Sequence, residues 1–103
     1  MRLTVLTSHP ATSTVALAAS WASAGDSVTL VLLDAAAALA RAGHPAARAL
    51  ADAERVGVVV VAHDDALRRR GLIGSSVSDG VKAVDLDEVA DLVVDGADKA
   101  VWL

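Results

Sequence analysis

The segment from residue 55 to residue 63, RVGVVVVAH, constrains the fold more than any other part of the chain. It contains five valines and runs directly into Asp64 and Asp65. Valine is β-branched and favours strands, and a near-continuous apolar run is typical of a parallel strand covered by helices on both faces. We therefore expect a strand at 56–62 with both faces buried. A ligand or partner site should then lie at its carboxyl end, around His63.

Strand and helix patterns alternate along the rest of the chain. Apolar runs predict strands at the following ranges: 3–7, 27–33, 56–62, 81–84 and 99–103. Helices are expected between them at these ranges: 12–24, 35–42, a short helix restarting at Pro45, 63–70 and 86–95. This order predicts an α/β fold in which right-handed βαβ units build a parallel sheet between layers of helices. The length of 103 residues fits a single domain spanning 1–103.

Polar residues before each helix predict how the helices begin. Hydroxyls from the segment 12–14 are expected to cap the first helix, Asp34 the second, and His63-Asp64 the helix after the valine-rich strand. Asp85 and Glu88 have the spacing of a capping box. The arginines at 68–70 are interpreted as a solvated helix end, where cations complement the helix dipole.

Composition excludes several classes of function. The net charge of −4 and the absence of a basic face argue against direct nucleic-acid binding. The absence of cysteine excludes disulfides, thiolate nucleophiles and thiolate zinc sites. A hydrophobic content of 54% in so small a domain favours an oligomer. No signal peptide or membrane span is expected, so the cytoplasm is the expected location.

A few polar and aromatic side chains are candidates for ligand or partner contact. His9 and His63 follow strand ends and, with Asp64 or Asp65, would supply an acid–base pair or a weak metal site; the alternative is two surface histidines. No metal-binding spacing supports a metal. Ser78 belongs to a polar loop at 72–80 that has no nucleophile elbow and is expected to contact solvent or a partner. Among the tryptophans, Trp21 is expected in the core, whereas Trp102 is either core or an interface anchor.

Several short motifs in the second half of the chain resemble a known family. These motifs are AHDDAL at 62–67, RGL at 70–72, VSDG at 77–80, VD at 84–85 and AVWL at 100–103. They resemble the small DsrH/TusB subunits of the DsrE/DsrF/DsrH and TusB/TusC/TusD sulfur-relay proteins. The likeness covers roughly residues 56–103 in motif, and the whole chain in length and element order.

This resemblance implies a three-layer α/β/α domain with a five-stranded sheet. It also implies a subunit of a hetero-oligomer that passes persulfide sulfur between proteins, as in tRNA 2-thiouridine synthesis or sulfur oxidation. The implied partners are DsrE/DsrF- or TusC/TusD-like subunits and a sulfur-carrier protein. The sulfur of such complexes is carried on cysteine, which this chain lacks. We therefore expect a subunit without chemistry or cofactor of its own, with contacts at His63–Asp65, the 72–77 loop and Trp102. The alternative is an anion- or ligand-binding domain, as a hydrolase or lyase using His9, His63 and Asp64.

Overall fold

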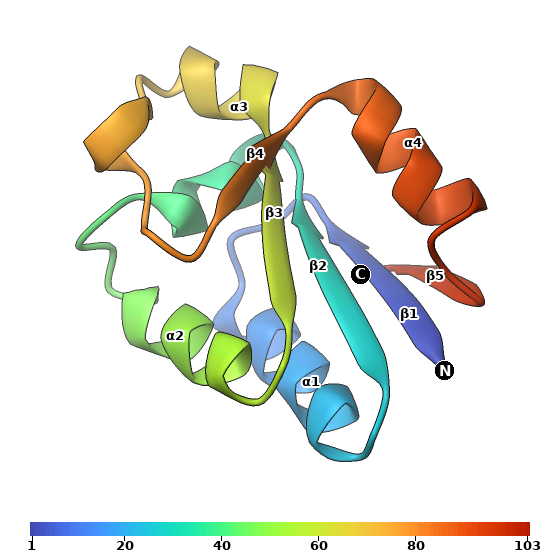
Figure 1. The fold of residues 1–103 in the computed structure, drawn as a ribbon. Helices are drawn as coiled ribbons and strands as arrows, with labels where there is room; N and C mark the ends of the chain where they lie inside the picture. Colours follow the sequence, from blue (N-terminus) through green and yellow to red (C-terminus); the bar gives the residue numbers. More distant parts are fainter.

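A sheet of five parallel strands forms the centre of the structure, a computed structural model that describes residues 1–103 (Figure 1). The strands are β1 (Arg2–Thr7), β2 (Ser27–Leu32), β3 (Val59–His63), β4 (Lys82–Val84) and β5 (Lys99–Trp102). Their order across the sheet is β4-β3-β2-β1-β5, and every neighbouring pair is parallel. The predicted α/β fold with a parallel five-stranded sheet is therefore confirmed.

Short helices connect the strands and cover the sheet. They are α1 (Thr12–Ser23), α2 (Ala47–Arg55), α3 (Asp64–Arg69) and α4 (Leu86–Val94), with 3-10 turns η1 (Asp34–Ala40) and η2 (Gly74–Ser76). No helix combines the length and the apolar character that a membrane crossing requires.

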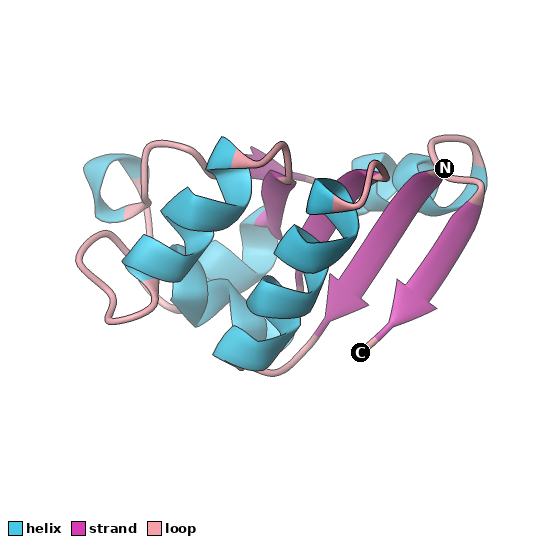
Figure 2. Cartoon of the chain, turned by 90° about the horizontal axis from the view of Figure 1, so that it is seen from below, coloured by secondary structure: helices cyan, strands magenta, loops and turns pink.

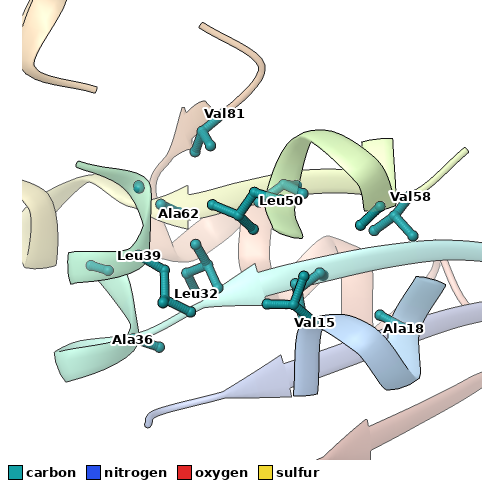
Figure 3. Packing of buried hydrophobic residues seen from close by; sticks show 14 of the residues in the cluster. Val15, Ala18, Leu32, Ala36, Leu39, Leu50, Val58, Ala62 and Val81 are labelled. Carbon is teal, nitrogen blue, oxygen red and sulfur yellow. The ribbon is translucent and has the colours of Figure 1, made fainter. Parts of the chain in front are cut away.

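One face of the sheet packs against α1, α2 and η1 and holds the larger hydrophobic core. Leu30 of β2 and Val60 of β3 are in register and belong to this face, and both are buried. The cluster contains 21 buried residues, among them Val15 of α1, Leu39 of η1 and Leu50 of α2. Figure 3 shows these side chains gathered between the helices and the strands. Removal of so much apolar surface from water supplies most of the driving force for folding.

The opposite face is covered by α4 alone and holds a much smaller core. This second cluster contains five buried residues: Leu6, Val31, Val61, Val84 and Val89. A hydrogen bond from the Thr4 hydroxyl to the Leu92 carbonyl, 3.0 Å long, ties α4 to β1. In Figure 1 α4 lies to one side of the sheet, and no helix passes in front of β2 and β3. Seen from below in Figure 2, several helices crowd one side of the sheet.

The valine-rich segment differs from the expected strand in two ways. The strand begins at Val59 rather than Val56, because Gly57, with φ of 107°, turns the chain after α2. Val59 is also 56% exposed, so the expectation that both faces are buried is wrong at this end of the strand. Val59 faces the α4 side, where the single helix does not reach it. The central strand of the sheet is β2, and β3 lies between β2 and the edge strand β4.

Most of the expected helix caps are absent, and one is confirmed. Ala11 and Leu33 occupy the positions before α1 and η1, and neither they nor His63 caps a helix with its side chain. Asp34 instead lies inside η1 with φ of 46°. Before α4, the Asp85 carboxylate accepts a hydrogen bond from the Glu88 N–H (2.8 Å), and the Glu88 carboxylate accepts one from the Asp85 N–H (3.3 Å). The capping box is therefore confirmed.

Candidate partner-contact site at the carboxyl end of the sheet

The exit of β3 places His63, Asp64 and Asp65 at the carboxyl edge of the sheet. His63 pairs with Val84 of β4, so its side chain lies on the same sheet face as α4, and it is 18% exposed. Asp64 and Asp65 form the first turn of α3. Carboxylates are favourable there because they meet the positive end of the helix dipole.

Arginine side chains neutralise the carboxylates of this exit. Arg68 lies 3.5 Å from Asp64, and Arg69 lies 3.2 Å from Asp65. Arg69 also reaches Asp34, 3.8 Å away at the end of β2. The Arg69–Asp34 pair joins α3 to the neighbouring strand exit, and the 58% exposure of Arg68 and Arg69 confirms that they form an exposed helix end. These ion pairs hold the Asp64 and Asp65 carboxylates in fixed orientations at the surface.

The structure does not bring the two candidate histidines together. His9 lies in the loop after β1, whereas His63 ends β3, and β2 runs between these strands. No hydrogen bond or ion pair joins His9 to His63 or to Asp64. The His63 Nε2 lies 3.9 Å from the Asp64 Oδ1, which is too long for a hydrogen bond. No group of three or more histidine, aspartate or glutamate side chains is placed to hold a metal ion.

The loop carrying Ser78 is fastened to η1 by backbone hydrogen bonds. The Ser78 N–H donates to the Ala40 carbonyl at 2.8 Å, and the Ala42 N–H donates to the Ser76 carbonyl at 2.8 Å. A hollow of about 240 Å³ lies between this loop and α3, lined in part by Asp64 and Ile73. The Ile73 side chain is 67% exposed. The hollow and its apolar rim have the character of a contact surface.

Trp102 lies at the opposite edge of the sheet from this loop. It ends β5, the edge strand beside β1, and its register with Leu6 places it on the α4 face. It is 65% exposed, so it does not belong to the core. Of the two alternatives, only the interface anchor remains a prediction. Trp21, by contrast, packs partly buried against the larger core.

Sequence reasoning missed a groove beside α4 on the smaller-core face. The groove has a volume of about 490 Å³ and lies between α4 and strands β2, β3 and β4. On the α4 side its wall presents Glu88, Asp91 and Asp95, the last of these directly after the end of α4. The spacing of these carboxylates in the sequence, three and four residues apart, could have indicated one helix face. The groove itself depends on where α4 lies over the sheet, which the sequence does not reveal.

Two carboxyl groups outside the β3 exit have displaced pKa values. Burial raises the pKa of Glu54, which lies on α2 with its carboxylate against the backbone of Gly80. Hydrogen bonds from the Arg2 backbone and side chain hold the pKa of Asp98 below its ordinary value. Both carboxyl groups therefore affect the stability of the fold, and neither lies at the exit of β3.

Known structures similar to this chain share its entire architecture. The ychN protein from E. coli matches with a TM-score of 0.86 and 19% identity over 100% of both chains. MTH1491 from Methanobacterium thermoautotrophicum matches with a TM-score of 0.81 and 16% identity, over 99% of this chain and 98% of that one. BT1422 from Bacteroides thetaiotaomicron matches with a TM-score of 0.82 and 15% identity, over 99% and 94%. At these identities the likeness shows the fold alone.

The comparison with protein families agrees with the motifs in the second half of the sequence. Curated proteins give no match to this chain. The family model described as "DsrH like protein" matches residues 7–98, which includes the exit of β3, the Ser78 loop and α4. The resemblance recognised in the sequence is therefore confirmed, and the chain belongs to the DsrH-like family.

Proposed function

We propose that this protein is a non-catalytic subunit of a sulfur-relay complex, working beside homologous DsrE/DsrF- or TusC/TusD-like subunits and a sulfur-carrier protein. The observation that carries the proposal is membership of the DsrH-like family in a chain with no cysteine. Persulfide transfer requires a thiolate that attacks the sulfane sulfur and then holds it. This chain has no thiol to do so, and its role would be to assemble and position the subunits that have one.

The polar exit of β3 supports this role more than an independent enzyme. The carboxylates of Asp64 and Asp65 are paired with arginines. His63 lies too far from Asp64 for a hydrogen bond, so the two do not form a hydrogen-bonded acid–base pair. Exposed apolar side chains at Ile73 and Trp102 supply surface that an assembly would bury. The pathway we propose is tRNA 2-thiouridine synthesis or sulfur oxidation, in the cytoplasm.

The test is purification of the tagged protein from its native host, followed by mass spectrometry and reconstitution. We expect a cysteine-bearing paralogue to copurify in fixed stoichiometry. Addition of this subunit should speed transfer of labelled sulfur from that paralogue to its carrier, with no label retained on this chain. A protein that copurifies with no paralogue, or that leaves the transfer rate unchanged, would contradict the proposal.

Trp102 offers a sharper test of the assembly itself. Truncation of a buried interface tryptophan commonly costs about 2 kcal/mol or more, so Trp102→Ala should weaken assembly by roughly 30-fold. Leu17→Ala is the matched control, because Leu17 is an exposed apolar residue on α1, which covers the opposite face. Sedimentation velocity of the purified complex measures the effect. If wild type and Trp102→Ala are both monomers at micromolar concentration with the paralogue present, Trp102 is not an anchor.

A further inference from the structure

The groove beside α4 combines an apolar floor with an acidic wall. Its floor includes Val59, Val61 and Val84, which lie on the same sheet face, and Leu92 projects into it from α4. Val59, the first residue of β3, is 56% exposed. An exposed apolar side chain that continues the floor of a groove marks a place where a further apolar group can be buried.

The charges on the wall of the groove are not balanced within the chain. Glu88 lies 3.9 Å from Lys82, which stands on the opposite side of the groove. Asp91 and Asp95 also line the groove, and no lysine, arginine or histidine lies within ion-pair distance of either. Asp91 lies on α4 and Asp95 directly follows its last residue, so these two carboxylates, four residues apart, lie on one side of the helix.

We propose that this groove is a docking site for a basic, apolar-bearing segment of a partner polypeptide. Charge complementarity selects that occupant, since lysine or arginine side chains would pair with Asp91 and Asp95 while an apolar side chain covers Val59. An acidic wall repels nucleic acid. A second copy of this chain is disfavoured because its net charge is −4.

The position of the groove favours a polypeptide over a small cation. The groove reaches Lys82 and Val84 of β4, an edge strand with β3 as its one neighbour. The outer backbone N–H and C=O groups of an edge strand are open to another chain. A polypeptide can use those groups and the apolar floor together. The inference deepens the proposed subunit role and rests on it for the existence of a protein partner.

The experiment is an NMR titration of the ¹⁵N-labelled full chain with a synthetic 12-residue peptide of alternating lysine and leucine. We expect amide shifts concentrated at Val59, Val61 and residues Asp91 to Asp95 at the end of α4, and binding that weakens as salt is added. The same peptide with glutamate in place of lysine is the control for charge. Shifts that map elsewhere overturn the proposal, and so does equal binding of the glutamate peptide.

Charge variants identify which carboxylates matter. An exposed ion pair contributes at most about fivefold in affinity, so Asp91→Asn with Asp95→Asn should weaken peptide binding roughly tenfold. The matched control is Asp79→Asn with Asp87→Asn, which removes the same charge from exposed positions that do not line the groove, and should change binding less than twofold. Equal losses in the two double variants overturn the proposal. Concentration-dependent shifts at Val59 without peptide would show a second copy in the groove, which also overturns it.

The same variants separate this inference from the proposed function. If a cysteine-bearing paralogue copurifies equally with wild type and with Asp91→Asn/Asp95→Asn, the subunit role stands and the groove is not its docking site. If no paralogue copurifies but the peptide binds as described, the subunit role fails and the groove remains a binding surface.

Discussion

The two faces of the sheet are built from the same strands but are stabilised very differently. On the face covered by α1, α2 and η1, the buried cluster has 21 residues, whereas the face covered by α4 buries five. Adjacent valines of β3 show the contrast directly, since Val60 is 1% exposed and Val59 is 56% exposed. One face is therefore covered by helices of the chain itself, and the other keeps apolar surface available for a partner.

The helices on the two faces also depend on different interactions. Ala11 before α1 supplies no side-chain cap, and this helix is held by packing of Val15 and Ala18. Before α4, Asp85 and Glu88 form a capping box, while Val89 is the one residue of the helix that is fully buried. Local hydrogen bonds stabilise α4 where burial contributes little.

The largest expected effect tests the two helical layers with the same substitution. Leu50→Ala on α2 should lower the free energy of unfolding by about 3 kcal/mol, because Leu50 is 1% exposed and its removal leaves a cavity. Leu92→Ala on α4 should cost about 1 kcal/mol, because this side chain is only partly buried against the smaller cluster. Urea unfolding of both variants gives the difference. Equal losses in the free energy of unfolding would show that the two helical layers contribute equally to stability.

A smaller effect is expected at the start of α4. Asp85→Ala removes the cap and should cost about 1 kcal/mol. Hydrogen exchange should show the loss as faster opening of α4 than of α1, because little burial holds α4 in place. Asp87→Ala is the control, since Asp87 lies in the same first turn but makes none of the capping-box hydrogen bonds. An equal increase in the hydrogen-exchange rates of both helices would argue that α4 does not open separately.

The smallest effects concern pH and have opposite signs at Glu54 and at Asp98. The folded-state pKa of Glu54 is raised above its ordinary value of 4.5, so its charge destabilises the fold at neutral pH and the penalty disappears as the group protonates. Glu54→Gln should therefore raise the melting temperature at neutral pH and have no such effect below pH 4.5. The absence of any pH dependence in this difference would contradict burial as the cause.

Asp98 should behave in the reverse manner. Its pKa is held below the ordinary 3.8 by hydrogen bonds from Arg2, so its stabilisation is present above that pH and is lost as pH falls through the folded-state pKa. Asp98→Asn should lower the melting temperature slightly at neutral pH and not at strongly acidic pH. Arg2→Gln, measured in the same pH series, should reduce this difference if Arg2 is its source.

The sequence predicted the element order and the parallel sheet because each pattern depends on local spacing of apolar residues. The capping box was equally readable, since Asp85 and Glu88 need only each other. The exposure of Val59 could not be read from the sequence, because five valines look alike and burial depends on whether a distant helix covers them. The caps expected at Asp34 and the segment 12–14 failed because tertiary packing of α1 and η1 replaced local hydrogen bonding.

The candidate site was predictable in part for the same reason. The run from His63 to Asp65 had to follow a parallel strand, so its place at the carboxyl edge was determined by the fold. Convergence of His9 with His63 required adjacent strands, and strand order is not a local property: β2 separates them. The groove beside α4 depends on the lateral position of one helix. Its one sign in the sequence is the four-residue spacing of Asp91 and Asp95.

The pairing of β1 with β5 has a consequence for synthesis of the chain on the ribosome. β1 is made early, yet the edge that faces β5 finds its partner only when residues Lys99 to Trp102 have been made. Until then the nascent protein exposes the backbone of one of its most buried strands, beside a face that α4 has barely covered. Pairing of that open edge with another chain before β5 is in place is therefore a route to aggregation.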